Sequence, residues 1–264
     1  MASRTRQKEE ARAQRIAEEQ ARSERDRRSR RLRMLGGIAL GVVAVVAVVI
    51  AISASGGGSS GSVKTGTEAT AIQAEVAALL GGIPQSGATL GNPSAPVTMV
   101  YYGDLECPIC KDFTLQGGFP EFVTKQVRTG KAKVLYRSLQ TATQNPQTFL
   151  TQQVAALAAG DQSHFWDYTE LFYRQQGQEG TDYANEAFLT GLARQIPSMN
   201  QQEWRTSRQN PAHTNTVKAD EQSATAAGIN ATPTLIMEGP KGKSQVPGGV
   251  PSYDQLMQSY NAVA

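Results

Sequence analysis

The residues that most directly suggest chemistry are two cysteines. Cys107 and Cys110 stand three residues apart in the segment CPIC, and the chain of 264 residues has no other cysteine. Such a pair can form a structural disulfide, bind a metal or exchange electrons as a dithiol. A bridge across so short a loop removes little chain entropy. A tetrahedral metal site needs further ligands, and there is no second cysteine pair to supply them.

The surroundings of the cysteines favour a redox dithiol. A β-rich stretch at residues 97–102 precedes Cys107, and the segment after it has a helical pattern. We therefore expect Cys107 at a helix N-terminus, where free N–H groups and the helix dipole stabilise a thiolate and lower its pKa. Pro108 suits the first helical position, where its missing N–H has no partner. Cys107 is predicted to be the attacking thiol, and the more buried Cys110 the resolving one.

The pattern along the chain predicts the elements that hold this pair. Strands are expected at residues 97–102, 131–140 and 232–239, where β-branched and aromatic residues gather. About ninety residues between the second and third strands carry amphipathic helical patterns interrupted by Gly or Pro. Pro251 and Ser252 open a last helix. A strand–helix–strand unit, a helical insertion, then a strand and a helix together predict an α/β fold.

Charge and hydropathy set the N-terminal region apart. Residues 1–33 hold twelve Lys/Arg and six Asp/Glu, whereas the rest of the chain holds fourteen and seventeen. Residues 34–52 contain no charge and no proline, and as a helix they would span roughly 28 Å, close to the hydrocarbon thickness of a bilayer. We predict a transmembrane anchor. The alternative is a cleaved signal peptide, although its apolar core is usually only about 7–15 residues long.

The basic flank of the predicted anchor indicates its orientation. Arginines crowd residues 25–33, whereas only Lys64 follows within fifteen residues of the anchor. The positive-inside rule then places the N-terminus in the cytoplasm and everything after residue 52 outside the cell membrane. A nucleic-acid-binding tail is the alternative for residues 1–33. It is disfavoured because no aromatic residue there could stack on bases.

Two separated motifs resemble one family. The segments GDLECPICKDF and, far downstream, GINATPTLIM are similar to the DsbA-like branch of the thioredoxin superfamily, closest in pattern to its anchored Gram-positive and actinobacterial members. The likeness covers about residues 83–262 and includes IPQSGATLGNPSAPVTM, FWDYTELFY and GGVPSYDQLMQSY. It implies a thioredoxin-like core with an inserted helical domain, dithiol–disulfide exchange with secreted proteins, and a cis peptide bond before Pro233.

The resemblance and the composition together predict seven segments. They are a basic cytoplasmic tail (1–33), a transmembrane anchor (34–52), a Gly/Ser linker (53–67), a lead-in helix and loop (68–94), the first part of the thioredoxin-like core (95–145), the helical insertion (146–228) and the second part of the core (229–264).

The resemblance also assigns a substrate-binding position. A proline at the first residue of a strand donates no hydrogen bond, and a cis bond before Pro233 would leave the Thr232 backbone free to pair with an incoming peptide. One departure concerns Ile109. It stands where the best-known enteric members have a histidine, and it cannot hydrogen-bond a thiolate through its side chain.

Two carboxylates beside the motif are candidate supporting residues. Glu106 directly precedes Cys107, so its negative charge would oppose a thiolate there. Asp104 and Glu106 are expected to be solvated loop carboxylates, with proton transfer as the alternative. His164 and His213 have no partner motif and receive no role, and no metal site is predicted.

The sequence therefore predicts a membrane-anchored, extracytoplasmic thiol–disulfide oxidoreductase that oxidises reduced or unfolded secreted proteins and needs no cofactor. The resemblance implies reoxidation by a membrane partner of the DsbB or vitamin K epoxide reductase type. The expected contacts are these proteins and membrane lipid, not nucleic acid. The alternatives are a reductase or isomerase with the same fold, and an anchored thioredoxin-like module that binds without turnover.

Overall fold

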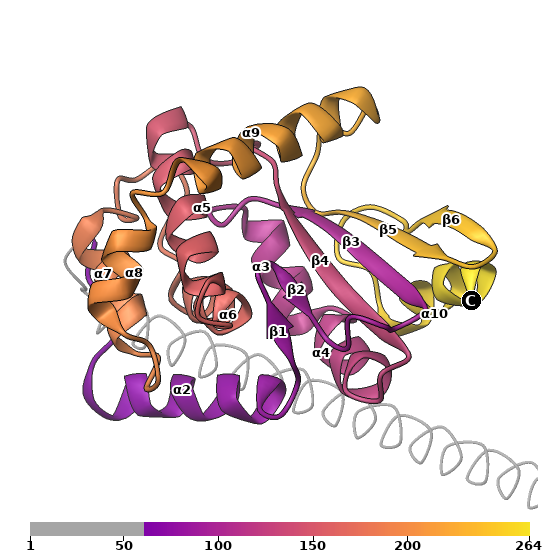
Figure 1. The fold of residues 1–264 in the computed structure, drawn as a ribbon, viewed down its shortest axis with the longest axis horizontal. Coiled ribbons are helices and arrows are strands. Elements are labelled where there is room, and N and C mark those ends of the chain that lie inside the picture. The colour runs from indigo at the N-terminus through magenta and orange to yellow at the C-terminus, as the bar shows by residue number, and fades with distance from the viewer. Residues whose placement is uncertain (1–60) are drawn as a thin grey trace, which may run out of the picture. The chain divides into compact units, whose positions relative to one another are not determined.

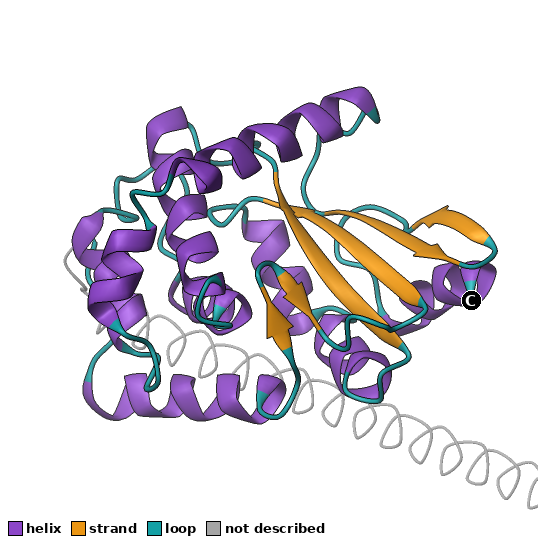
Figure 2. Ribbon diagram, in the orientation of Figure 1, coloured by secondary structure: helices purple, strands orange, loops and turns teal. Residues whose placement is uncertain are grey.

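The computed structural model describes residues 61–264 of the chain, which form a six-stranded mixed sheet with helices packed around it (Figures 1 and 2). The predicted basic tail, the predicted anchor and most of the Gly/Ser linker lie outside the described residues. Among residues 61–264, no helix has both the length and the apolar character needed to cross a membrane.

The strands follow the order β1-β2-β4-β3-β5-β6 across the sheet. They are β1 Gln85–Ser86, β2 Thr89–Leu90, β3 Val97–Gly103, β4 Ala132–Ser138, β5 Thr234–Gly239 and β6 Gly242–Gln245. The central strands β3 and β4 are parallel, whereas β5 runs antiparallel to β3 on its other side. All three predicted strands are present. The third begins two residues late because Pro233 cannot donate to the ladder.

The helices fill the intervals between the strands. They are α2 Gly66–Leu80, α3 Pro108–Gln116, α4 Phe119–Phe122, the π-helical turn η1 Val123–Val127, α5 Pro146–Gly160, α6 Phe165–Gln175, α7 Glu186–Arg194, α8 Gln201–Ser207, α9 Pro211–Ala226 and α10 Tyr253–Val263. Side-chain caps begin most of the later ones, because an Asn or Ser oxygen accepts otherwise unpaired N–H groups. The caps are Asn145, Asn185, Asn200, Asn210 and, in a capping box, Ser252.

Strand β3 is buried on both faces. Its side chains alternate, so Met99 and Tyr101 enter the main core while Val100 and Tyr102 enter a smaller cluster with Ala224 of α9. Figure 1 shows α5 to α8 gathered at one side of the sheet and β6 with α10 at the other. The five helices α5 to α9 lie between β4 and β5 in the chain, as the predicted helical insertion requires.

The lead-in differs from the expected helix and loop, because it contains the β1–β2 hairpin. Two-residue strands are too short to show an alternating pattern in sequence. Contacts with a distant helix hold them instead: the Trp166 indole N–H donates to the Ala88 carbonyl at 3.1 Å, and the Trp166 backbone N–H donates to Gln85 Oε1 at 2.9 Å.

Candidate dithiol site

Cys107 lies between the central strand β3 and the helix α3. Strand β3 ends at Gly103, a short turn follows, and Cys107 is the N-cap residue of α3 with Pro108 at the first helical position. The Cys107 sulfur accepts a hydrogen bond from the Cys110 backbone N–H at 3.4 Å. This arrangement, predicted from the sequence, directs unpaired N–H groups and the positive end of the helix dipole at the sulfur.

The two thiols differ strongly in acidity. A hydrogen bond from the Cys110 thiol is the largest influence on the pKa of Cys107. Further hydrogen bonds from Thr232 and the backbone N–H groups of Cys110 and Ile109 outweigh burial and lower that pKa to about 6. Burial, with Cys107 beside it, raises the pKa of Cys110 well above its ordinary value. Both cysteines are free. The negative charge of the reduced pair therefore sits on Cys107.

The loop before β5, which contains Thr232 and Pro233, contacts Cys107. The Thr232–Pro233 peptide bond is cis, as the resemblance implies. The carbonyl oxygen of Thr232 lies 3.4 Å from the Cys107 sulfur. The Thr232 hydroxyl also forms a short hydrogen bond with the Thr141 hydroxyl. The structure thus brings together Cys107, Cys110, Thr232 and Pro233, which the sequence singled out.

Asp104 corrects one expectation, because it is fully buried rather than a solvated loop carboxylate. Its oxygens accept the backbone N–H groups of Glu106, Thr141, Ala142 and Thr143 at 2.8–3.0 Å, and the Thr143 hydroxyl at 2.5 Å. All of these donors except the Glu106 N–H come from residues 141–143, almost forty residues further along the chain, so local sequence gives no sign of them. Asp104 fixes the loop that touches Thr232.

Glu106 is also buried, contrary to the same expectation, with only 4% of its surface exposed. Its Oε1 has no hydrogen-bond partner. Burial, followed by the nearby Asp104 charge, raises the pKa of Glu106 to about 7. The side chain is therefore largely neutral below pH 7, so it opposes the Cys107 thiolate less than an ionised glutamate would.

Three further residues that the sequence did not single out support the motif. The Tyr101 hydroxyl lies 3.1 Å from the Thr114 hydroxyl and donates to the Cys110 carbonyl at 3.3 Å. The Tyr173 hydroxyl donates to the Asp104 carbonyl at 3.3 Å. Gln176 Nε2 donates to the carbonyls of Leu105 and Cys107 at 2.8 and 3.1 Å. The inward position of Tyr101 on a predicted strand was a signal, whereas nothing local marks Gln176.

The remaining candidates have simpler surroundings. Pro108 begins α3, and the Ile109 side chain is 42% exposed beside the cysteines. His164 and His213 pair with Asp167 and Asp161, away from the motif. Within residues 61–264, no group of three or more His, Cys, Asp and Glu side chains could hold a metal ion.

The sheet, the helical insertion and a dithiol at the start of α3 define a thioredoxin-like fold of the DsbA type. The model of the family described as Thioredoxin matches residues 85–248. The chain therefore belongs to that family.

Solved structures share this fold. BdbD from Bacillus subtilis, in its oxidised form, matches with a TM-score of 0.57 and 21% identity over 68% of this chain and 95% of that one. DsbA2 from Pseudomonas aeruginosa matches with a TM-score of 0.54 and 23% identity over 69% and 97%.

Curated relatives match along part of their length. The Disulfide bond formation protein D of Bacillus subtilis is 25% identical over 153 residues, 56% of this chain and 66% of that protein. A protein named Na(+)/H(+) antiporter NhaA 1 from Mycolicibacterium gilvum is 32% identical over 158 residues. These make up 59% of this chain and 24% of the antiporter, so the chain spans only about a quarter of that relative.

Proposed function

We propose that this chain is a thiol–disulfide oxidoreductase that forms disulfides in other proteins. The observation that carries the proposal is the pairing of an acidic Cys107 thiol at the start of α3 with a buried, weakly acidic Cys110 thiol. The relative named for disulfide bond formation supports it.

The proposed reaction is two thiol–disulfide exchanges. A substrate thiolate attacks the Cys107 sulfur of the oxidised pair, forming a mixed disulfide, and Cys110 leaves as a thiolate. Cys110 then takes up a proton because its pKa is high. The second substrate thiolate attacks the substrate sulfur of the mixed disulfide, and Cys107 leaves as a stable thiolate. The substrate loses two electrons, and the cysteine pair gains them.

The acidity of Cys107 supports the oxidising direction. A stabilised thiolate favours the reduced pair, and a dithiol that is stable when reduced is a good oxidant. Equilibration of the pair with a glutathione buffer should give a reduction potential above about −220 mV, because thioredoxin, a reductant, lies near −270 mV. A potential at or below that of thioredoxin would support a reductase instead.

The amount of protein needed per substrate molecule distinguishes catalysis from simple binding. A catalyst restores the activity of reduced, unfolded ribonuclease in an oxidising glutathione buffer when present at a tenth of the substrate concentration or less. A binding module would act only in proportion to its amount. Replacing Cys107 by Ser should abolish the effect, since the mixed disulfide forms there.

We propose further that residues 34–52 anchor the domain to the outer face of the cell membrane, where a membrane partner of the DsbB or vitamin K epoxide reductase type reoxidises it. The basic flank at residues 25–33 and the uncharged stretch after it support this location. Protease added to intact spheroplasts should digest the domain and leave a short anchored stub. Complete protection would contradict the orientation.

A further inference from the structure

A small polar cavity adjoins the dithiol site. It has a volume of about 100 Å³ and lies between residues 143–148 and residues 180–182, with Glu106 in its wall. Because Glu106 directly precedes Cys107, the cavity lies one residue from the reactive sulfur in the chain. It has room for the end of a long side chain but not for a large ligand.

Two carboxyl groups and no cationic side chain line the cavity. Glu106 is 4% exposed, and its Oε1 has no hydrogen bond. Asp182 lines the same cavity, and the charges of Asp104 and Glu179 also act on Glu106. None of the residues that line the cavity is Lys, Arg or His. A buried carboxyl group with no cation beside it stays largely protonated, and a positively charged group in the cavity would favour its ionised form.

The other polar groups of the wall argue against a metal ion. The Thr143 hydroxyl is engaged with Asp104 and Gln152, and Asn145 Oδ1 accepts two N–H groups at the start of α5. A calcium ion requires about six to eight oxygen ligands, and only two carboxyl groups, those of Glu106 and Asp182, line the cavity. An ammonium or guanidinium group needs only one or two carboxylates to form charge-assisted hydrogen bonds.

The geometry points to this cavity as a binding site for a Lys or Arg side chain of the substrate polypeptide. The bound Lys or Arg would lie close, in the substrate, to the cysteine that reacts with Cys107, because Glu106 is held in place directly beside Cys107 in the chain. Gln176 Nε2 holds the Leu105 and Cys107 carbonyls on either side of Glu106. This inference rests on the proposed function and adds to it a preference for basic residues beside the reacting cysteine.

The test uses the full chain in detergent with synthetic dithiol peptides and with oxidised glutathione, which regenerates the Cys107–Cys110 disulfide after each turnover. The peptides are identical except for Arg, Gln or Glu beside the first cysteine. The wild-type protein should oxidise the Arg peptide with a kcat/KM about tenfold above that of the Gln peptide, the effect expected of a hydrogen bond between charged groups. Glu106→Gln and Asp182→Asn should each bring this ratio close to one. The ratio cancels any general loss of activity.

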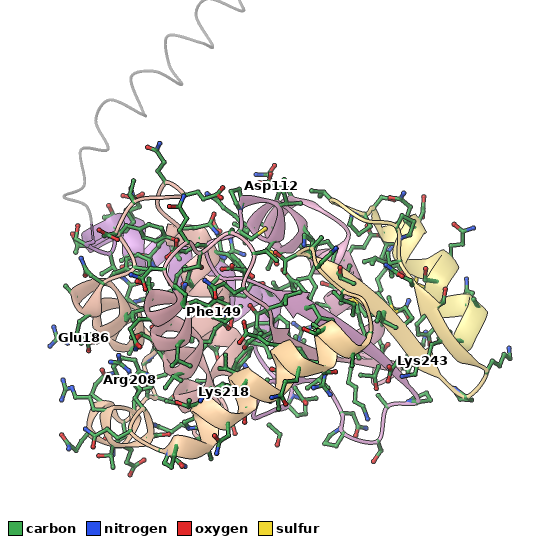
Figure 3. The ribbon with its side chains drawn as sticks, turned by 90° about the horizontal axis from the view of Figure 1, so that it is seen from above. Asp112, Phe149, Glu186, Arg208, Lys218 and Lys243 are labelled. Atoms are coloured by element: carbon green, nitrogen blue, oxygen red, sulfur yellow. The ribbon has the colours of Figure 1, made fainter. Side chains whose placement is uncertain are left out.

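Asp112→Asn is the matched control. It removes a negative charge from α3, where Asp112 lies at the surface and not in the cavity wall (Figure 3). The ratio should stay near tenfold in this variant. A ratio that collapses in the control as well would show a general charge effect and overturn the proposal.

The remaining outcomes are separable. Equal kcat/KM values for the three peptides in the wild-type protein would overturn the side-chain site but leave the proposed function intact. If no peptide is oxidised, the proposed function fails, and this inference fails with it. Saturable thermal stabilisation by Ca²⁺ alone, lost in Asp182→Asn, would assign the cavity to a metal ion instead. Should Glu106→Gln not fold, the exposed Asp182→Asn decides the result.

Discussion

The sulfur of Cys107 lies 3.4 Å from the carbonyl oxygen of Thr232, although 125 residues separate the two in the chain. The sheet creates this contact, because β5 pairs with β3 so that Thr234 lies opposite Tyr102. The loop before β5 then ends beside the turn that follows β3. The environment of the reactive thiol is therefore set jointly by two distant segments.

The first prediction concerns the Thr232 hydroxyl. The hydrogen bond from the Thr232 side chain to the Cys107 sulfur helps to lower the pKa of Cys107, so Thr232→Val should raise that pKa. A hydrogen bond worth about 0.5–1.5 kcal/mol corresponds to a shift of roughly 0.4–1.1 pKa units. The thiolate absorbance near 240 nm, followed against pH, measures the shift.

Thr234→Val is the control for this experiment. The Thr234 hydroxyl donates to the Ala231 carbonyl in the same loop and not to the sulfur. The control should titrate like the wild-type protein. Identical titrations in all three proteins would mean that Thr232 does not stabilise the thiolate.

The second prediction concerns which thiol reacts. In the reduced protein, iodoacetamide should alkylate Cys107 and leave Cys110 almost unmodified, because the pKa of Cys110 is raised and its side chain is fully buried. The rate at Cys107 should rise with pH around a midpoint of about 6, since the thiolate is the nucleophile. Peptide mapping by mass spectrometry distinguishes the sites. Equal labelling would refute the assigned roles.

Local sequence patterns were enough to predict much of the fold and the position of the cysteine pair in it. The strand at residues 97–102, the helix after it and the place of Pro108 all depend on neighbouring residues, so they could be predicted. The cis bond before Pro233 was implied by the family resemblance and supported by the place of the proline at the start of a strand. The burial of Asp104 and Glu106 was not predicted, because charged side chains are usually exposed. The segment that covers them lies almost forty residues further along the chain. Burial of this kind depends on tertiary packing.

The third prediction follows from the buried Asp104. Its carboxylate accepts four backbone N–H groups and one hydroxyl, so an amide in its place would turn an N–H₂ group towards donors. Asp104→Asn should lower the free energy of unfolding by about 2–4 kcal/mol. Urea denaturation measures this loss, and the surface change Asp112→Asn should stay within about 0.5 kcal/mol of the wild-type protein. A similar small effect for Asp104→Asn would contradict the proposed role in fixing residues 141–143.

The fourth prediction is a pH dependence of stability caused by Glu106. Folding raises its pKa from the ordinary 4.5 to about 7, since the side chain is buried near Asp104, Asp182 and Glu179. Between these values the folded state binds more protons than the unfolded state. Glu106 therefore stabilises the fold fully below pH 4.5, and this contribution is lost as the pH rises through 7.

Glu106→Gln removes this titration, because an amide has no proton to lose. The variant should gain stability relative to the wild-type protein as the pH rises from about 4.5 to 7, with a slope of no more than about 1.4 kcal/mol per pH unit, and the difference should level off above pH 8. Cys107 also titrates in this range, but it is present in both proteins, so its effect largely cancels in the difference. Urea denaturation at several pH values gives the curve. A difference that is constant from pH 4.5 to 8, or one that falls, would show that Glu106 is not held in its neutral form by the fold.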